Sequence, residues 1–277
     1  MTRLAVGDLS VEVVVEGDPG APPVVLVHSA GTDHRMWDPG LPVLRDRFRV
    51  IRYDVRGHGR SDVPPPPYTL EGLGGDLVGI LDALDVASTH VVGASLGGLV
   101  ALWLAAERPE RVRRAVVAGA AARIGTPASW QERADAVRRG GTEAVVDLVM
   151  RRFFSEGFRR EHGDVVAGFA DVLRRQAPAG YVGTCLALRD ADLRDEEGTC
   201  LALRDADLRD EVSAIRASSL ILVGDEDVST PPSEAEALTR AIPVARLTAL
   251  EGAGHLCTVE RPDVFGEVAQ HLSEEVA

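Results

Sequence analysis

The segment HVVGASLGGLVALWLAA, residues 90–106, decides the fold, because an apolar strand, a glycine-rich turn and an apolar helix follow one another in it without a gap. We expect the strand over 90–93 and the helix over 99–106. Between them, the letters GASLG at residues 93–97 match the pattern G-x-S-x-G. After a strand and before a helix, this pattern places the serine hydroxyl on a sharp, exposed bend.

Ser95 is the expected nucleophile on that bend. The glycines beside it leave room where a side chain would clash with the tight turn. The N-terminus of the next helix offers free N–H groups and positive potential to a developing oxyanion. The alternative is a glycine-rich turn in a binding fold, which matches the same sequence pattern but has no nucleophilic serine.

Apolar and β-branched runs alternate with helical stretches on both sides of this segment. The run 9–16 indicates a strand that enters a hairpin at the turn 17–20. Further strands are expected over 24–27, 48–53, 111–117, 220–223 and 245–250, and a last helix after Pro262. Strands that alternate with helices predict a fold of the α/β class with a doubly wound, mostly parallel sheet.

One long part of the chain carries no strand signal. From residue 123 to about residue 216 the composition is helical, with glycine and proline breaks. We therefore expect a core formed by residues 1–122 and 217–277, and a helical cap over 123–216 that is inserted between two strands of the sheet.

The cap segment contains a tandem duplication. The letters GTCLALRDADLRDE occupy residues 183–196 and again 198–211, so the repeat units are 183–197 and 198–212. Two copies are too few for a solenoid, which needs several stacked repeats. The simplest explanation is a recent insertion without a function of its own. One copy should then occupy the ancestral place, while the other extends a helix or loop.

A serine nucleophile needs a base, and His255 is the expected one among seven histidines. It lies in the loop GAGHL between the last strand and the last helix. In a doubly wound sheet, the loops at the carboxyl ends of the strands assemble the site. A solvated surface histidine is the alternative.

A carboxylate should stand behind the imidazole and follow another strand. The strand 220–223 leads through Gly224 into the acidic run 225–227. We select Asp227, three residues after the glycine, with Asp225 as the main competitor.

The loop His28-Ser29-Ala30-Gly31 follows the strand 24–27. We expect the backbone N–H of Ala30 to complete an oxyanion hole with the N–H of Leu96, which follows the nucleophile. Side-chain identity matters little for a backbone donor. His28 is expected to be structural rather than catalytic.

These motifs resemble the α/β-hydrolase superfamily over nearly the whole chain. Ser95, Asp227 and His255 follow one another in the order of that superfamily, and RGHGRS at 56–61 adds to the likeness. A narrower resemblance, to the 3-oxoadipate enol-lactone hydrolases of aromatic catabolism, rests on four segments. The first comprises residues 28–77 and begins HSAGTDHRMWD. The other three are residues 121–141 (AARIGTPASWQERADAVRRGG), residues 180–194 (GYVGTCLALRDADLR) and residues 224–232 (GDEDVSTPP).

The chain also departs from that family. Several members carry asparagine where this chain has His28, and the family normally has one copy of GTCLALRDADLR. These departures leave Ser95, Asp227 and His255 in place and bear on the geometry of the cap.

The resemblance implies an α/β-hydrolase fold and the hydrolysis of 3-oxoadipate enol-lactone to 3-oxoadipate through an acyl-enzyme. Ser95 would attack, His255 would take its proton, and Asp227 would hold the imidazole. The alternatives are a carboxylesterase or a cofactor-free perhydrolase with the same residues, and a hydrolase-like binding protein.

The implied substrate carries a carboxylate, whereas the chain is acidic with a net charge of −13. A local arginine is therefore needed. We expect Arg133 to hold the carboxylate and Trp130 to wall the pocket, since residues three apart share a helix face. A solvated arginine and a packing tryptophan are the alternative.

The composition limits the partners. The chain has 277 residues with 45% hydrophobic and 26% charged residues, the balance of a soluble globular protein. Its negative charge argues against nucleic acid or an anionic membrane, which leaves a small-molecule lactone or ester as the partner. All 30 basic residues are arginine, so a lysine Schiff base and a P-loop lysine are excluded. A homo-oligomer is compatible with the sequence.

Three cysteines form no disulfide framework, which favours a reducing compartment. The N-terminus has no apolar core of a signal peptide, so we expect the cytoplasm. No clustered Cys and His spacing indicates a metal, and the implied mechanism needs no cofactor. Cys257, two residues from His255, is expected to be a buried apolar group.

Overall fold

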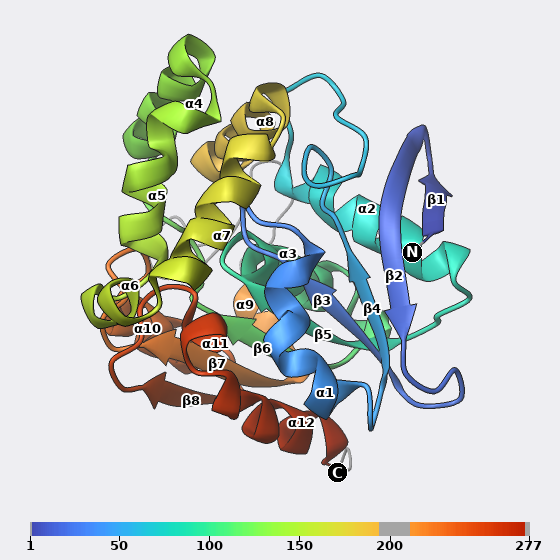
Figure 1. Ribbon diagram of the computed structural model, residues 1–277. Helices are drawn as coiled ribbons and strands as arrows, with labels where there is room; N and C mark the ends of the chain where they lie inside the picture. The colour runs from blue at the N-terminus through green and yellow to red at the C-terminus, as the bar shows by residue number, and fades with distance from the viewer. Residues whose placement is uncertain (1, 194–210, 275–277) are drawn as a thin grey trace.

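The computed structural model describes residues 2–193 and 211–274 and contains one eight-stranded sheet with helices on both faces (Figure 1). The strand order is β1-β2-β4-β3-β5-β6-β7-β8. The pairs β1–β2 and β2–β4 are antiparallel and all others are parallel, which confirms the expected mostly parallel α/β sheet. The strands are β1 Thr2–Val6, β2 Leu9–Glu16, β3 Pro23–Val27, β4 Arg49–Tyr53, β5 Thr89–Ala94, β6 Val112–Ala118, β7 Ser218–Gly224 and β8 Ala245–Leu250.

The expected hairpin at 17–20 is wrong. After β2 the chain passes over the end of β4 and enters β3, so that β4 separates the two strands. The fully apolar β3 requires an interior position with both faces covered, and it obtains one between β4 and β5. The actual hairpin joins β1 to β2 at Gly7 and Asp8, and β1 was not predicted.

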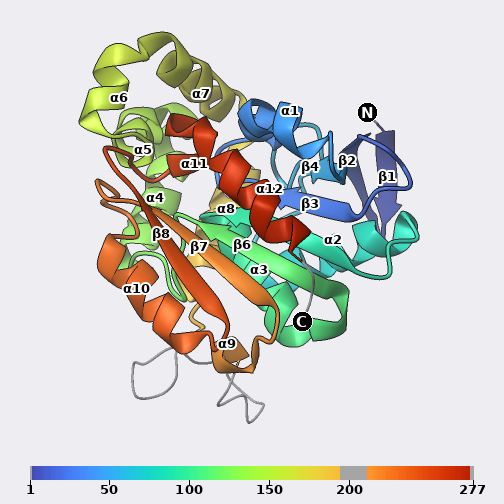
Figure 2. The ribbon, with the colours of Figure 1, turned by 90° about the horizontal axis from the view of Figure 1, so that it is seen from below.

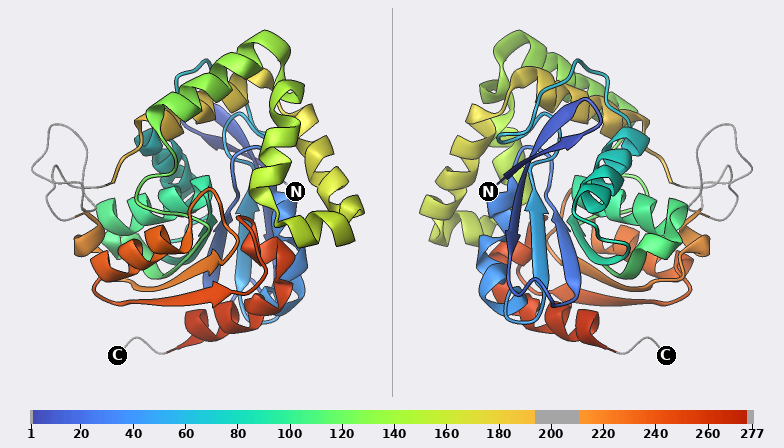
Figure 3. Two further views of the ribbon diagram at one scale, coloured as in Figure 1. Left: turned by 90° about the vertical axis from the view of Figure 1, so that its left-hand side faces the viewer. Right: turned by 90° about the vertical axis from the view of Figure 1, so that its right-hand side faces the viewer.

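Helices cover both faces of the sheet. Figure 2 shows α12 lying across one face with α1 beside it, and Figure 3 shows α3 and α10 on the opposite side. The α-helices of this core are α1 Leu41–Leu44, α2 Leu70–Ala83, α3 Leu96–Glu107, α9 Glu211–Ala214, α10 Pro232–Ala241, α11 Cys257–Glu260 and α12 Phe265–Ser273. The short 3₁₀ helices are η1 His34–Gly40, η2 Pro109–Arg111, η3 Thr142–Val145 and η4 Pro262–Val264. Because α3 lies inside this layer, its residues from Leu96 to Ala105 are all buried.

A group of helices lies between β6 and β7 in the chain and gathers above the sheet (Figure 1). They are α4 Pro127–Gly140, α5 Val146–Phe153, α6 Glu156–Glu161, α7 Gly163–Arg175 and α8 Pro178–Asp190. We call these five helices the cap. The prediction of a helical insertion between sheet strands is therefore confirmed, whereas the residue boundaries 123–216 stay a prediction.

The cap is fastened to the core at the junction between α7 and α8. The Gln176 side chain accepts the Gly59 N–H at 2.9 Å and donates to the Thr32 carbonyl at 2.9 Å. Gly180 lies directly against Gly57, where a Cβ atom would collide with the Gly57 carbonyl. These contacts hold the cap close to the loops that follow β3 and β4.

The first copy of the duplicated segment forms the end of α8. Residues 183–188 are buried, and α8 packs along α4. Residues 194–210, which contain most of the second copy, lie outside the described residues. Among the residues that are described, no helix is long and apolar enough to cross a membrane.

Candidate active site

Ser95 stands between β5 and α3 in a conformation that few residues other than glycine adopt, with φ +53° and ψ −115°. Such strain persists only where the surroundings fix it, and it is typical of functional positions. The Ser95 N–H donates to the Ala118 carbonyl at 2.9 Å, and its carbonyl accepts from the Leu99 N–H at 3.1 Å. The bend is therefore held from the neighbouring strand and from the helix.

The glycines of the motif are required by close approach of the backbone. A Cβ atom on Gly93 would collide with the Gly97 carbonyl. A Cβ atom on Gly97 would collide with the Val27 carbonyl of β3. The letters G-x-S-x-G thus let α3 begin directly against two strands.

His255 and Asp227 form a buried pair. The Asp227 Oδ2 atom lies 2.8 Å from His255 Nδ1, and both side chains are almost inaccessible to solvent. Asp227 also accepts the Thr230 hydroxyl at 2.6 Å and the Ser229 N–H at 2.7 Å. Asp225 instead is exposed and accepts the Gly252 N–H, so the geometry favours Asp227 over its competitor.

The surroundings keep Asp227 ionised. Burial alone would raise the pKa of its carboxyl group, but the facing His255 and the hydrogen bonds from His255 and Thr230 outweigh burial and lower it. A carboxylate has no proton to donate, so the hydrogen of this pair resides on His255 Nδ1. Nε2 of His255 is left as the basic nitrogen.

Ser95 and His255 line the same small pocket. Its other walls come from the loops after β3, β6 and β7 and from α4 and α5 of the cap. The Phe153 ring of α5 stacks on the His255 ring at 6.3 Å between centroids. The pocket thus lies between the carboxyl edge of the sheet and the cap, the usual place for a ligand in this architecture.

Ala30 lies in the wall of this pocket. Leu96 is the first residue of α3, a position whose N–H has no acceptor within an α-helix. The structure thus places Ala30 in the wall of the pocket that Ser95 also lines, and Leu96 next to Ser95 in the chain. Their role as the oxyanion hole stays a prediction.

Trp130 and Arg133 both line the pocket from α4. The Arg133 guanidinium carbon lies 4.3 Å from the centroid of the Trp130 ring, and the indole N–H donates to the Ile124 carbonyl at 2.5 Å. The Arg133 Nε atom is buried without a hydrogen-bond partner among the described residues. The two side chains therefore share one helix face that looks into the pocket.

A second arginine of the pocket, Arg152 of α5, was missed by sequence reasoning. Burial and then the proximity of Arg133 lower the pKa of Arg152. In the part of the chain that the structure describes, no carboxylate forms an ion pair with either guanidinium. The spacing of Val149, Arg152 and Phe153 places all three on one helix face, but nothing in that spacing shows that this face meets the pocket.

One group of residues has the donor types of a metal site. Asp33, His34 and Asp54 bring three such atoms within 4.8 Å of one another. Asp33, however, is paired with Arg35, and Asp54 accepts from His34 Nδ1 at 2.7 Å. These donors are occupied by protein partners, so the group does not offer an open site.

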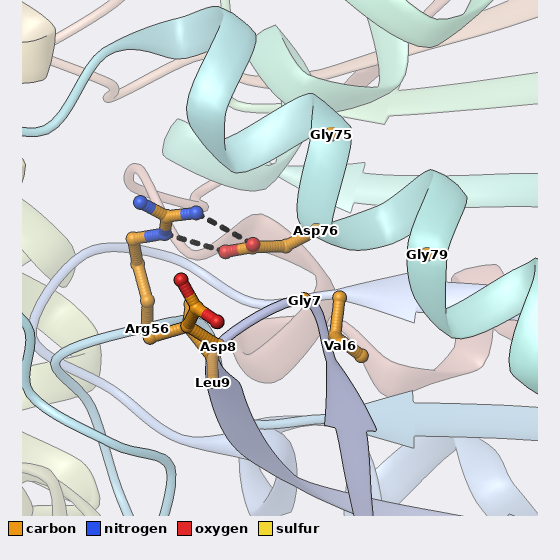
Figure 4. Close-up of a pocket in the computed structure, with 8 residues that line it drawn as sticks. All are labelled: Val6, Gly7, Asp8, Leu9, Arg56, Gly75, Asp76 and Gly79. Carbon is orange, nitrogen blue, oxygen red and sulfur yellow. Dashed lines mark hydrogen bonds and ion pairs between the residues drawn. The ribbon is translucent and has the colours of Figure 1, made fainter.

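A separate cleft lies between the β1–β2 hairpin and α2 (Figure 4). Arg56 and Asp76 face each other there in a two-point ion pair, with Nη2 to Oδ1 at 2.6 Å. Because the guanidinium is neutralised within the protein, this cleft offers no free cation to a substrate. Arg56, part of the RGHGRS motif, thus holds α2 to the loop after β4.

Comparison with known proteins agrees with the fold and the motifs. The family model for the alpha/beta hydrolase fold matches residues 22–262. The 3-oxoadipate enol-lactonase 1 of Acinetobacter baylyi is 33% identical over 259 residues, which are 94% of this chain and 91% of that protein. A putative carbamate hydrolase, RutD of Klebsiella pneumoniae, is 28% identical and covers 90% of both chains. The enol-lactonase structure from Burkholderia xenovorans LB400 superposes with a TM-score of 0.91 at 35% identity, covering 99% of this chain and 100% of that one. The chain therefore belongs to the alpha/beta hydrolase family.

Proposed function

We propose that this protein hydrolyses 3-oxoadipate enol-lactone to 3-oxoadipate. The observation that carries the proposal is the pairing of two kinds of group in one pocket. Ser95 and His255 line it, and Arg133 and Arg152 line it without a carboxylate partner among the described residues. A lactone with a pendant carboxylate suits both kinds of group, because its ester bond can react with Ser95 while its carboxylate forms ion pairs with the arginines. The similarity to two enol-lactonases supports this choice.

Acylation begins at Ser95. Its Oγ attacks the lactone carbonyl while His255 Nε2 takes the proton, and Asp227 stabilises the imidazolium that forms. The N–H groups of Ala30 and Leu96 stabilise the oxyanion of the tetrahedral intermediate. One such donor is typically worth about 3 kcal/mol of activation free energy.

Ring opening breaks the bond between the carbonyl carbon and the ring oxygen. His255 returns its proton to that oxygen, and the resulting enol tautomerises to the ketone. A water molecule, activated by the neutral His255, then cleaves the acyl-enzyme and regenerates Ser95. Arg133 and Arg152 keep the pendant carboxylate in place through both steps.

A second candidate function is the hydrolysis of another acyl bond by the same residues. It is favoured by the similarity to a protein named as a putative carbamate hydrolase. The deciding experiment measures the loss of 3-oxoadipate enol-lactone beside that of 4-nitrophenyl acetate, with Ser95→Ala as the control. Rapid lactone loss that Ser95→Ala abolishes supports the proposal. Ester turnover with an inert lactone supports an esterase instead. If neither compound is turned over while the enol-lactone still binds, the chain is a binding protein.

A further inference from the structure

Two buried histidines beside the pocket have no part in the reaction described above. His28 follows β3 and His58 lies in the loop after β4, and both are essentially inaccessible, with 0% and 1% of their surface exposed. Their rings meet edge to face, with centroids 5.4 Å apart and planes at 62°. They connect the loop after β4 to the loop after β3, which carries Ala30, one of the expected oxyanion donors.

Each histidine accepts a backbone N–H through Nε2. The Gly31 N–H donates to His58 Nε2 at 2.9 Å, and the Val55 N–H donates to His28 Nε2 at 2.9 Å. A ring nitrogen that accepts a hydrogen bond carries no proton, so both rings are neutral with the hydrogen on Nδ1. Nδ1 of His28 then donates to the Ser29 carbonyl at 2.8 Å.

These hydrogen bonds fix one tight turn, formed by residues 29–32. The Thr32 N–H donates to the Ser29 carbonyl at 3.2 Å and closes the turn around Ala30 and Gly31. The Ser29 N–H contacts Met36 Sδ at 3.3 Å, and the Gly31 N–H is held by His58. Of the four N–H groups in this turn, only that of Ala30 has no acceptor among the residues described.

We propose that His28 and His58 are positioning residues, which hold the 29–32 turn so that the Ala30 N–H points at the reacting carbonyl oxygen beside Ser95. This inference rests on the proposed hydrolase function. His58 acts directly through the peptide that follows Ala30. His28 ties the start of the same turn to Val55, on the loop that carries His58.

The charge state of the pair supports this role. Burial, followed by the proximity of His28, lowers the pKa of His58 to about 3. Burial also lowers the pKa of His28, although Asp54 acts in the opposite direction. Both rings therefore remain neutral acceptors at neutral pH, and the turn keeps its hydrogen bonds there.

The test compares two variants of His58. His58→Leu removes the acceptor, whereas the amide oxygen of His58→Gln can reach the place of Nε2. With 4-nitrophenyl acetate, we expect His58→Leu to lower kcat about 10- to 100-fold with KM within about twofold, since an oxyanion donor acts mainly on the transition state. His58→Gln should recover kcat to within about threefold of the unaltered protein, a rescue that mere filling of space would not give.

His90→Leu is the matched control. His90 is a buried histidine of β5 whose ring packs against Phe48 at 5.7 Å, and no contact joins it to the turn in the described structure. Its kcat should stay within about twofold of the unaltered protein. Unchanged kcat in a folded His58→Leu protein overturns the inference. An unaltered protein that is inactive on both ester and lactone instead overturns the proposed function.

A second measurement needs no variant and stays decisive if His58→Leu fails to fold. Nitrogen-15 NMR of the unaltered protein reports the tautomer of each ring and the coupling across an N–H···N bond. We expect the hydrogen of both rings on Nδ1, and a coupling between the Gly31 nitrogen and Nε2 of His58. A proton on Nε2 of His58 overturns the inference.

Discussion

Asp225 and Asp227 lie two residues apart in one loop, yet their surroundings differ. Asp225 is exposed, whereas Asp227 is buried and faces His255 at 2.8 Å. The sequence offers both carboxylates at similar distances from β7. Only the path of the loop, held by hydrogen bonds from Ser229 and Thr230 to Asp227, decides which one turns inward.

This difference predicts unequal losses on substitution. Asp227→Asn should lower kcat about 10³- to 10⁴-fold, because the amide removes the charge that holds the reactive tautomer of His255. Asp225→Asn is the matched control and should retain kcat within about threefold. Steady-state hydrolysis of 4-nitrophenyl acetate measures both. A larger loss in Asp225→Asn than in Asp227→Asn would reverse the assignment.

Arg133 and Arg152 approach each other from separate cap helices, α4 and α5. The placement of Arg133 follows from its spacing after Trp130 within one helix. That of Arg152 depends on how α5 packs over the sheet, which no local pattern specifies. Single-helix periodicity can therefore predict one arginine of the pocket but not the second.

Arg152→Ala should weaken the binding of an anionic substrate without harming the chemistry. We expect KM for the enol-lactone to rise about 10- to 100-fold, the loss of one charge-assisted contact of about 1.5–3 kcal/mol. The neutral ester 4-nitrophenyl acetate should show kcat/KM within about threefold of the unaltered protein. Arg151→Ala, which alters the exposed neighbour, should change neither substrate. Equal losses on lactone and ester would show that Arg152 supports the fold instead of the carboxylate.

At the scale of elements, the strands that were predicted are those with continuous apolar or β-branched runs. β1 was not predicted because its five residues, TRLAV, are mostly exposed and contain only a short apolar run. The hairpin assigned to the turn 17–20 was wrong for a related reason. A turn signal says where the chain bends, but the neighbour of each strand is decided by which apolar strand needs an interior place.

The cap depends on a close contact between α8 and the loop after β4. Gly180→Ala would place a methyl group against the Gly57 carbonyl, which is backbone and cannot swing away. We expect the free energy of unfolding to fall by about 1–3 kcal/mol, as for other overpacked sites. Gly168→Ala on α7, where a Cβ meets nothing within 4 Å, is the control and should gain up to about 1 kcal/mol. Urea unfolding measures both, and equal stabilities would show that the contact is loose.

The duplication gives a deletion with a single product. Removing residues 183–197 or residues 197–211 leaves the same chain, because the two copies are identical. The result is therefore independent of which copy is ancestral. We expect the deletion protein to fold and to hydrolyse substrate with kcat within about threefold, since one copy suffices for α8. A deletion protein that does not fold would show that the second copy is structural.

For the whole molecule, the candidate site is assembled from segments that lie far apart in the chain. The placement of Ser95, Asp227 and His255 at one edge of the sheet could be predicted, because each follows a recognisable strand and parallel strands bring their carboxyl ends to one edge. The N–H···N bonds of His28 and His58 could not be predicted, because they join two loops whose separation depends on the whole sheet. Sequence patterns thus locate side chains at the edge, while the packing of loops and cap decides which atoms meet.

Buried neutral histidines also affect the stability of the whole molecule. Burial, with Arg113, Arg114 and His271 adding to it, lowers the pKa of His90 from 6.5 to about 4. Between these pH values His90 is protonated in the unfolded chain but stays neutral in the folded protein. The free energy of unfolding therefore falls as the pH decreases from about 6.5 to about 4. His90 alone should contribute about 3 kcal/mol to this fall.

His90→Leu tests the effect, because leucine has no proton to bind. Its free energy of unfolding should fall between pH 7 and pH 4 by about 3 kcal/mol less than that of the unaltered protein. The pKa of His58 is lowered to about 3, so the free energy of unfolding should continue to fall below pH 4 in both proteins. Urea unfolding at successive pH values measures the two curves. Curves that stay parallel over this range would mean that His90 takes up its proton in the folded protein as readily as in the unfolded chain.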